Sequence, residues 1–274
     1  MLLDLICFDC LMEQVNKGVS KDVGSEPIMT PFEPVNNDGL YKVNCHKGHQ
    51  SLTVIDNINF EILFDYSINA IADGYYREAV SSFTSAMERY YEFFIKVVLK
   101  ASGNSFSDID NIWKTISHQS ERQLGAYVIL YSQTFLEESD LLNNNKETKF
   151  RNSVIHKGYI PSKDEAVNFG NRVMEIIEGS LIKLKSKYPK EVEETFDNFG
   201  YKKLAETSIK KTEKETGNEL NFACVNIMTT INVKHGREIN KDDGRKGDVL
   251  TQIERVIKRR NLRKLRLVKD KPIK

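Results

Sequence analysis

The chain has 274 residues, 40% of them hydrophobic, which is enough apolar material for one large domain or for a core domain with appendages. That composition excludes a disordered chain. Charge is nearly balanced overall, but residues 201–274 hold 20 of the 40 basic residues and only 10 of the 39 acidic ones, which leaves 20 and 29 in residues 1–200. This distribution predicts a basic carboxyl-terminal region whose role differs from that of an acidic core.

The sequence offers no signal for a membrane or for secretion. It has no run of about 18 apolar residues, so we expect neither a transmembrane helix nor a membrane partner. The first residues lack the basic start and the long apolar stretch of a secretion signal. We therefore expect a cytoplasmic protein, in which the four cysteines favour thiols or metal ligands over disulfides.

Two pairs of soft ligands lie near the amino terminus. Cys7 and Cys10 are spaced as C-x2-C, and Cys45 and His49 are spaced as C-x3-H. Both spacings are permitted in a closed tetrahedral Zn²⁺ site, and the set resembles that of a small zinc ribbon. His46 is a weaker substitute for His49 as the fourth ligand.

The segment between the two pairs is polar and rich in glycine and proline, so it cannot build a core of its own. A structural Zn²⁺ ion would supply the missing stability. Four protein ligands leave no open position for water, so this metal is expected to be structural and not catalytic. The alternative is an accidental pair of buried cysteines beside a surface histidine.

A helical pattern begins near residue 60 and predicts helices over residues 60–73, 76–98, 107–117 and 121–142. The second of these carries a broad apolar face with residues at three- and four-residue steps: Tyr76, Ala79, Val80, Phe83, Ala86, Met87, Tyr90, Phe93, Phe94, Val97 and Val98. An aromatic stripe can line a ligand pocket, but at helical spacing it is nearly always core, and we interpret it as core.

The segment from Arg151 to Pro161, Arg-Asn-Ser-Val-Ile-His-Lys-Gly-Tyr-Ile-Pro, offers the most specific chemistry of the chain. Arg supplies a permanently charged fork that suits a phosphate, and His transfers protons near neutral pH. Ser162 and Glu165 then form a capping box at the start of a long helix. Arg151 and His156 thus lie just ahead of a helix N-terminus, where backbone donors favour an anion.

This combination resembles HEPN-domain proteins: an all-helical core with Arg-polar-x-x-x-His, then Lys-Gly-x-x-Pro and a helix that contains Glu-Ala. The matching residues are Arg151, Asn152, His156, Lys157, Gly158, Pro161, Glu165 and Ala166. The helix pattern covers residues 60–187, and the close match is confined to residues 150–166. The resemblance implies a bundle of four or five helices that dimerises, so that two such segments face each other across one cleft.

Many HEPN proteins are metal-independent endoribonucleases of toxin–antitoxin, abortive-infection or other antiviral systems. The residues present are sufficient for that chemistry. One His156 from each of two copies would supply a base and an acid, and two copies of Arg151 would stabilise the charged phosphate. Asn152 would orient His156 or a phosphate oxygen. The expected partners are therefore RNA, a second copy of the chain, and an antitoxin or another component of a defence system.

Three alternatives stay open at this point. Arg and His five residues apart also occur by chance. Some HEPN proteins keep the fold and only bind RNA or nucleotides, so a non-catalytic adaptor is one alternative to the nuclease. An interaction module of a defence complex, with the zinc ribbon as its docking surface, is another.

The carboxyl-terminal region, residues 189–274, is expected to contain a helix, a strand and a second helix. Residues 190–217 are polar and helix-prone, and we interpret them as a solvated connecting helix. Period-two alternation predicts a strand over residues 220–234, in which Cys224 is a packed residue and not a ligand.

The last helix combines an apolar face with a high density of Arg and Lys. Such density fits contacts with a phosphate backbone, although docking onto the acidic core or onto a partner protein is the competing interpretation. The candidate RNA-binding residues are Lys157, Arg255, Lys258, Arg259, Arg260 and Arg263. The complete expected architecture is mainly α: a zinc-ribbon-like element in residues 1–57, a HEPN-like helical bundle in residues 58–188, and the small basic α+β region.

Overall fold

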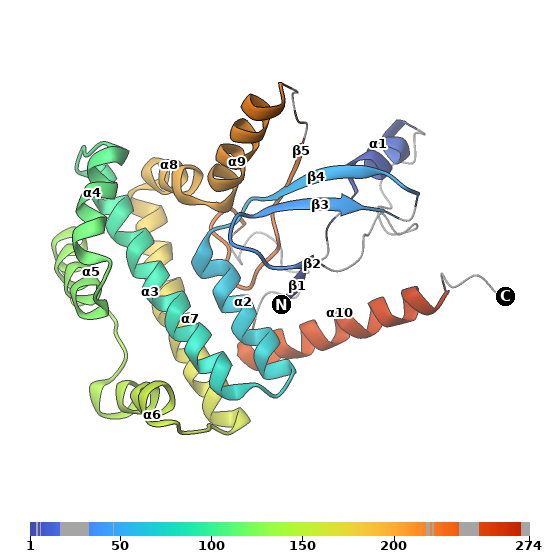
Figure 1. Cartoon of the computed structure of the whole chain (residues 1–274). Helices are drawn as coiled ribbons and strands as arrows, with labels where there is room; N and C mark the ends of the chain where they lie inside the picture. Colours follow the sequence, from blue (N-terminus) through green and yellow to red (C-terminus); the bar gives the residue numbers. More distant parts are fainter. Residues whose placement is uncertain are drawn as a thin grey trace. The chain divides into compact units, whose positions relative to one another are not determined.

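The computed structural model describes residues 1–3, 5, 7–16, 33–45, 47–217, 220, 222–235 and 247–269. Within these residues the chain is mainly helical and contains a small three-stranded sheet (Figure 1). It divides into two compact units, each built from two stretches of sequence. The first comprises Met1–Ile58 and Phe196–Ile227, and the second comprises Asn59–Thr195 and Met228–Lys274.

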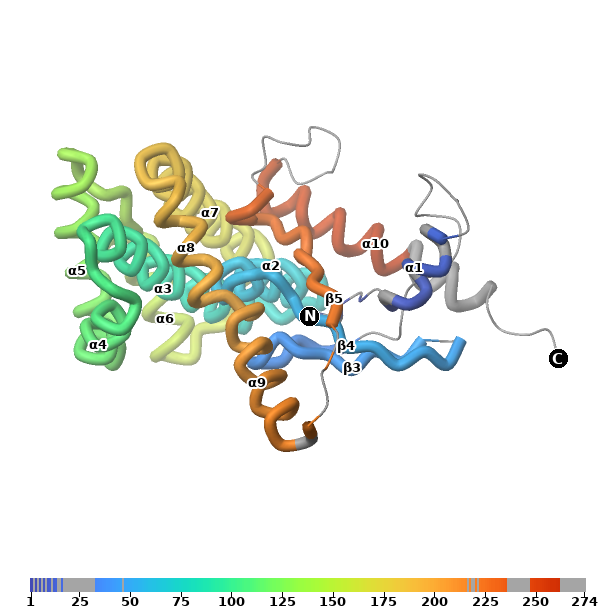
Figure 2. The backbone as a smooth tube through the Cα atoms, turned by 90° about the horizontal axis from the view of Figure 1, so that it is seen from above, coloured from blue at the N-terminus to red at the C-terminus, as the bar shows by residue number. Residues whose placement is uncertain are grey.

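The first unit is organised around a β-hairpin. Its elements are β1 (Leu2–Leu3), α1 (Phe8–Asn16), β2 (Glu33–Pro34), β3 (Leu40–Asn44), β4 (Gln50–Ile55), α9 (Tyr201–Thr216) and β5 (Phe222–Val225). Strands β3 and β4 pair antiparallel, β5 adds to β4 in parallel, and β1 pairs with β2 separately. Helix α9 packs against the hairpin through a small core of Val54, Ala205 and Ile209 (Figure 2).

The second unit is a helical assembly. Its elements are α2 (Asn59–Ala72), α3 (Tyr76–Ala101), α4 (Phe106–Ile116), α5 (Ser120–Phe135), the π-helical turn η1 (Asn144–Thr148), α6 (Lys149–Lys157), α7 (Lys163–Lys187), α8 (Pro189–Phe199) and α10 (Val249–Lys269). The end of α8, from Phe196 onward, belongs to the first unit. Helix α3 is central, because α2, α4, α5, α6 and α7 all contact it.

The aromatic stripe of α3 is the core of the second unit, as its spacing predicts. Phe83, Tyr90 and Phe94 are fully buried. Tyr90 meets Phe60 of α2 edge-on with ring centroids 5.4 Å apart, and the neighbouring Tyr91 stacks on Tyr127 of α5 at 4.3 Å. These contacts show that the stripe serves as a packing face of the core.

Helix α5 ends at Phe135, seven residues before the predicted end at residue 142. Leu136 terminates it in the left-handed conformation, with φ of 57°. The acidic residues that follow are held by basic side chains of α7: Lys183 pairs with Glu137, and Arg172 pairs with Asp140. Tertiary ion pairs therefore override the local helical pattern here.

Residues 189–274, which were predicted as one basic region, are divided between the two units. Strand β5 pairs with β4 from Leu52↔Phe222 to Ile55↔Val225, which places this part of the chain in the first unit. Helix α10 instead packs against α2 and α7 in the second unit. The predicted connecting helix is also two helices, α8 and α9, separated at Gly200.

The predicted strand over residues 220–234 is limited to Phe222–Val225. Beyond it, buried side chains of the second unit satisfy the backbone. Asp65 accepts from the N–H of Thr230 at 2.8 Å, and Glu61 accepts from the N–H of Val233 at 2.5 Å. Because α2 provides these acceptors, the segment needs no strand partner, despite its alternating sequence.

Candidate metal centre and the Arg151–His156 segment

Four predicted ligands, Cys7, Cys10, Cys45 and His49, come together in the first unit; we call them the Cys/His quartet. Cys7 directly precedes α1, and Cys10 lies in its first turn, so the C-x2-C spacing brings both thiols to one end of that helix. Cys45 and His49 flank the turn of the β3–β4 hairpin. The Cys45 N–H donates to the His49 carbonyl at 3.1 Å, which closes the turn.

The turn between Cys45 and His49 depends on Gly48. Its N–H donates to the Cys45 carbonyl at 3.0 Å, and its φ of 83° lies in the left-handed region that favours glycine. The spacing C-x3-H therefore returns the chain on itself, so that both ligands face α1. His46, the weaker alternative ligand, lies outside the described residues.

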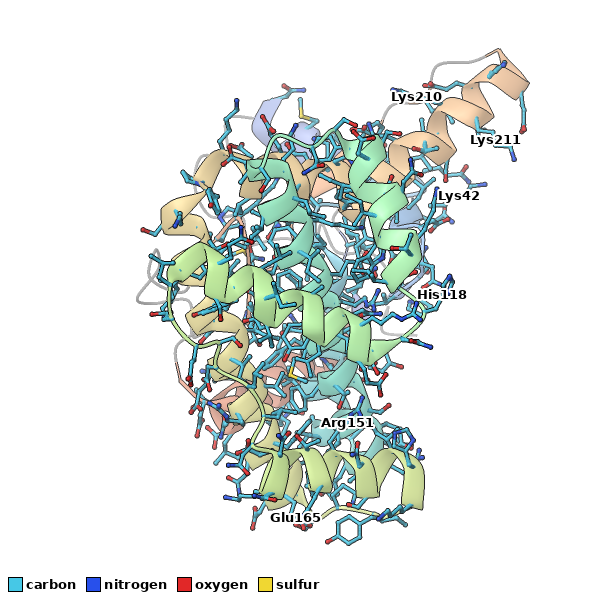
Figure 3. The ribbon with its side chains drawn as sticks, turned by 90° about the vertical axis from the view of Figure 1, so that its left-hand side faces the viewer. Lys42, His118, Arg151, Glu165, Lys210 and Lys211 are labelled. Atoms are coloured by element: carbon cyan, nitrogen blue, oxygen red, sulfur yellow. The ribbon has the colours of Figure 1, made fainter. Side chains whose placement is uncertain are left out.

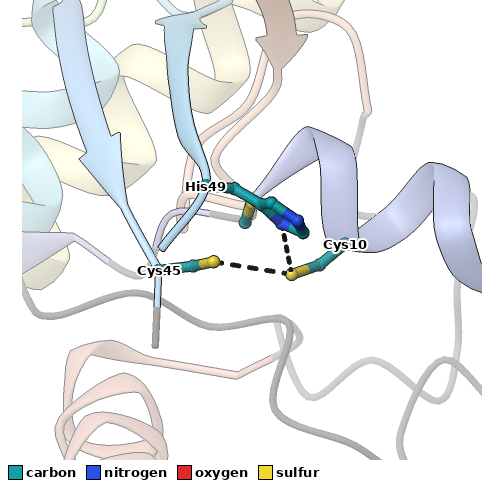
Figure 4. A group of neighbouring side chains, drawn as sticks. Cys10, Cys45 and His49 are labelled. Carbon is teal, nitrogen blue, oxygen red and sulfur yellow. Dashed lines mark hydrogen bonds between the residues drawn. The ribbon is translucent and has the colours of Figure 1, made fainter. Parts of the chain in front are cut away.

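The geometry of the quartet fits a single tetrahedral ion (Figure 4). The Sγ atoms of Cys10 and Cys45 are 3.6 Å apart, and His49 Nδ1 lies 3.3 Å from Cys10 Sγ and 3.8 Å from Cys7 Sγ. All four donor atoms lie within 4.8 Å of one another. Zinc bonds of about 2.3 Å to sulfur and 2.0 Å to nitrogen give tetrahedron edges of about 3.5–3.8 Å, which matches this arrangement.

Burial and local donors set the ionisation of the thiols. Burial by itself raises the pKa of Cys45, but the backbone N–H groups of His49 and Lys47, together with the other two thiols, outweigh it and lower this pKa to about 7. For Cys10, burial is the largest cause and hydrogen bonds to Cys45 and Cys7 add to it, so its pKa rises to about 12. Cys45 is thus the thiol prepared to bind a cation as thiolate.

Glu13, which no sequence motif singles out, also touches the quartet. Its Oε1 lies 3.2 Å from Nε2 of His49, and its Oε2 accepts from Nζ of Lys47 at 3.0 Å. Its spacing from Cys10 could have identified it. Glu13 follows Cys10 by three residues, and residues three apart lie on the same face of a helix.

The Arg151–His156 segment occupies α6, a helix of nine residues that follows η1 directly. The predicted turn and capping box are both confirmed. Gly158 ends α6 in the left-handed conformation, with φ of 72°. Ser162 Oγ then accepts from the Glu165 N–H at 3.3 Å while the Glu165 carboxylate accepts from the Ser162 N–H at 2.8 Å, at the start of α7.

The guanidinium of Arg151 is held in place from two sides. Its Nη2 donates to Glu88 Oε1 of α3 and its Nη1 donates to Asn152 Oδ1, both at 3.0 Å. The side chain is 22% exposed, and Figure 3 shows it beside α6 on the face of the helical unit turned toward the viewer. Asn152 therefore orients Arg151, whereas the sequence predicted that it would orient His156 or a phosphate oxygen.

His156 lies in the last turn of α6 and is exposed, and in the described part of the chain it has no hydrogen-bond or ion-pair partner. Lys157 beside it is exposed as well. Five residues of α-helix separate Arg151 from His156, which corresponds to about 140° around the axis and about 7.5 Å along it. The two side chains therefore leave α6 in different directions.

The basic residues of α10 divide into two groups. Arg255 donates to the Met228 carbonyl at 3.1 Å, and Arg260 donates to Asn69 Oδ1 at 2.7 Å and to both carboxylate oxygens of Asp73. For these two, docking onto the acidic side of their own unit is the better interpretation. Lys258 is exposed, whereas Arg259 is exposed only in part: burial lowers the pKa of its guanidinium, and Asp65 attracts it. The side chain of Arg263 lies outside the described part of the structure.

None of the described helices combines the length and the apolar character that a membrane crossing requires. Comparison of the chain with models of protein families, with curated proteins and with solved structures finds no match. The function of the molecule must therefore be inferred from its own residues and their geometry.

Proposed function

We propose that this chain is a metal-independent endoribonuclease of HEPN type, active as a homodimer in the cytoplasm, in antiphage defence or as a toxin. The observation that carries the proposal is the content of α6: a guanidinium oriented by Glu88 and Asn152 on the same short helix as an exposed histidine. An oriented cation for a phosphate and an accessible proton carrier are the two functions that RNA cleavage without metal requires.

The proposed reaction is an intramolecular transesterification. His156 of one copy removes the proton from a ribose 2′-OH, and the 2′-oxygen attacks the adjacent phosphorus. His156 of the second copy protonates the 5′-oxygen as the P–O bond to it breaks. The products are a 2′,3′-cyclic phosphate and a free 5′-OH, and Arg151 stabilises the extra negative charge of the pentacovalent intermediate.

Two copies are needed because one copy does not supply all the catalytic groups that the reaction requires. A single His156 cannot act as base and acid in one step, and its direction on α6 differs from that of Arg151. A two-fold axis near α6 would place a second histidine and a second guanidinium opposite the first pair. Tyr159 and Ile160, which are 44% and 75% exposed beside this helix, offer apolar surface for such a contact.

Glu88 makes Arg151 selective for a strongly charged ligand. The guanidinium has five N–H donors, and the contacts with Glu88 and Asn152 orient the fork while other donors can still reach a phosphate. The carboxylate also weakens the attraction of Arg151 for anions in general. Glu88 and the phosphate thus compete for Arg151. A phosphodiester that is also held by the partner copy would bind tightly enough to overcome this competition.

The test is cleavage of RNA by the purified protein in buffer with EDTA and no added divalent ion. We expect products with 2′,3′-cyclic phosphate ends and a loss of about 10²–10⁴-fold in rate for His156→Ala. His118→Ala is a matched control, because His118 is also an exposed histidine of the second unit (Figure 3). Undiminished cleavage by the His156→Ala protein would overturn the proposal.

Mixing experiments test the two-copy site separately. An excess of the His156→Ala chain, allowed to exchange with wild-type chains, should suppress their activity, because each mixed dimer has only one His156 side chain. Wild-type activity that is unaffected by the excess would mean that one chain contains the complete site. The His118→Ala chain, which keeps His156, should not suppress it.

The quartet supports a second, structural proposal: it binds Zn²⁺ that stabilises the first unit. Cys7, Cys10 and Cys45 are buried, and with His49 they fill a tetrahedral ligand set, which leaves no position for a catalytic water. A non-catalytic RNA-binding adaptor is the alternative to the nuclease, favoured by the exposed Lys157 and Lys258 and by the partly exposed Arg259. The adaptor alternative predicts that the chain binds RNA, that this binding weakens as salt is added, and that no cleaved product forms.

A further inference from the structure

We infer that Glu13 is a positioning residue of the quartet: its carboxylate fixes the ring of His49 so that Nδ1, and not Nε2, binds the metal. The inference rests on the proposed zinc site and is independent of the proposed nuclease. It concerns three groups of the first unit, namely the carboxylate of Glu13 in α1 and the side chains of His49 and Lys47 in the β3–β4 hairpin.

The positions of the two ring nitrogens of His49 point to this role. Nδ1 faces the thiols, 3.3 Å from Cys10 Sγ, whereas Nε2 faces away from them, 3.2 Å from Glu13 Oε1. A neutral imidazole carries its proton on one nitrogen only, and a nitrogen that binds a metal must be the other one. A carboxylate at Nε2 accepts that proton and leaves the lone pair of Nδ1 directed at the quartet.

Glu13 is itself oriented by the turn that holds His49. Its second oxygen, Oε2, accepts from Nζ of Lys47 at 3.0 Å, and Lys47 lies between the two hairpin ligands in sequence. Glu13 also lies on the same face of α1 as Cys10, three residues earlier. Helix α1 and the hairpin are therefore joined twice, once through the metal ligands and once through the carboxylate.

An ordinary surface ion pair is the competing explanation. The side chains of Lys47 and Glu13 are 34% and 40% exposed, so their ion pair by itself contributes little to stability. Glu13 also lies in the last turn of α1, where a negative charge opposes the helix dipole. Replacing it with alanine should therefore favour the helix, and a loss of zinc affinity in that variant could not come from a weakened helix.

The experiment measures zinc affinity of the full chain by competition with a chromophoric chelator, for wild type, Glu13→Ala, Glu13→Gln and Asp9→Ala. We expect one Zn²⁺ per wild-type chain, a loss of about 10–100-fold for Glu13→Ala, and a smaller loss for Glu13→Gln, whose amide oxygen still accepts from Nε2–H. Asp9 is an exposed acidic residue in the first turn of the same helix, where its charge favours the helix start, so Asp9→Ala removes the same charge and should lower the affinity by much less than Glu13→Ala.

Two spectroscopic readouts separate positioning from folding. Co²⁺-loaded Glu13→Ala should keep the thiolate charge-transfer bands of the wild type, because the ligands themselves are unchanged. In ¹⁵N-labelled, zinc-loaded wild type, His49 should carry its proton on Nε2. Equal affinities of Glu13→Ala and Asp9→Ala, or a His49 protonated on Nδ1, would overturn the role of Glu13, whereas a wild-type chain that binds no zinc would overturn the site itself.

Discussion

The Cys/His quartet of the first unit and the Arg151–His156 segment of the second differ in how much of a site one copy of the chain supplies. The quartet is complete: four donor atoms from α1 and the β3–β4 hairpin lie within 4.8 Å of one another. In the α6 segment, Arg151 is paired with Glu88 and Asn152, and His156 is exposed. The quartet is a closed set, because its four protein ligands leave no free position, and this suits a structural ion. The Arg151–His156 segment is an open set, because its side chains can still be approached by a substrate and by a second copy of the chain.

The largest effect is expected where the site is complete. Cys10→Ser, or removal of zinc with a strong chelator, should abolish metal binding and detach α1 from the hairpin. The reason is that zinc binding contributes about 10–16 kcal/mol to the folding free energy of small zinc domains. Zinc content and limited proteolysis of the first unit measure both outcomes.

Cys224→Ser is the matched control for that substitution, because Cys224 of β5, which was predicted to be packed, is instead an exposed cysteine of the same unit. It should retain zinc and protease resistance. If Cys10→Ser keeps a full equivalent of zinc, the quartet is not the metal site, and the comparison between a closed and an open set fails.

The next effect concerns the open set. Arg151→Ala should slow RNA cleavage by about 10²–10³-fold, because it removes the stabilisation of charge on the phosphate. Arg151→Lys should restore little of that rate, since a lysine has no planar fork to engage Glu88, Asn152 and a phosphate together. Single-turnover cleavage rates measure this, and full activity of the Arg151→Lys protein would show that only the charge matters.

A smaller effect should follow from relieving the competition for Arg151. Glu88→Gln keeps an acceptor for Nη2 of Arg151 but removes the negative charge, so RNA affinity at low salt should rise by about two- to fivefold, the equivalent of 0.5–1 kcal/mol. Fluorescence anisotropy with labelled RNA measures it, and Glu78→Gln on the same helix is the control. Weaker binding by the Glu88→Gln protein would mean that orientation of the guanidinium outweighs its net charge.

The smallest effect on the proposed activity is expected at the helix start behind the segment, where only stability should change. Ser162→Ala should cost about 1 kcal/mol of stability at neutral pH, because the first N–H groups of α7 lose their cap. The cap depends on ionised Glu165, whose pKa lies below its usual value because it accepts hydrogen bonds from Ser162 and Tyr159.

A carboxyl with a lowered pKa stabilises the fold above its unfolded pKa, and that contribution is lost as the pH falls through the folded pKa. The difference between wild type and Ser162→Ala should therefore shrink as the pH falls below about 4.5, the ordinary pKa of a glutamate side chain. Urea unfolding at several pH values measures it. A difference that is independent of pH would exclude coupling between Ser162 and Glu165.

Much of both sites could be predicted because their signals are local. The C-x2-C and C-x3-H spacings identify the quartet, since a helix start and a glycine turn fix which ligands of each pair face the same way. The capping box and the turn at Gly158 are likewise decided by residues within a few positions of one another. The apolar stripe of α3 predicts its buried face for the same reason.

Other features depend on partners that are distant in sequence. The β3–β4 hairpin escaped prediction because buried Thr53, Val54 and Ile55 follow one another and hide the alternation that reveals a strand. The strand near residue 222 was overextended, because acceptors on α2 take the backbone N–H groups of Thr230 and Val233.

By itself, the sequence determined which side chains are candidates for a metal centre and for the proposed RNA cleavage, because ligand spacing and helix capping act over a few residues. Only the tertiary structure decided that Glu13 lies against His49 and that Glu88 lies against Arg151. Those contacts join residues 36 and 63 positions apart, and such approaches depend on how whole helices and hairpins pack and not on any local pattern.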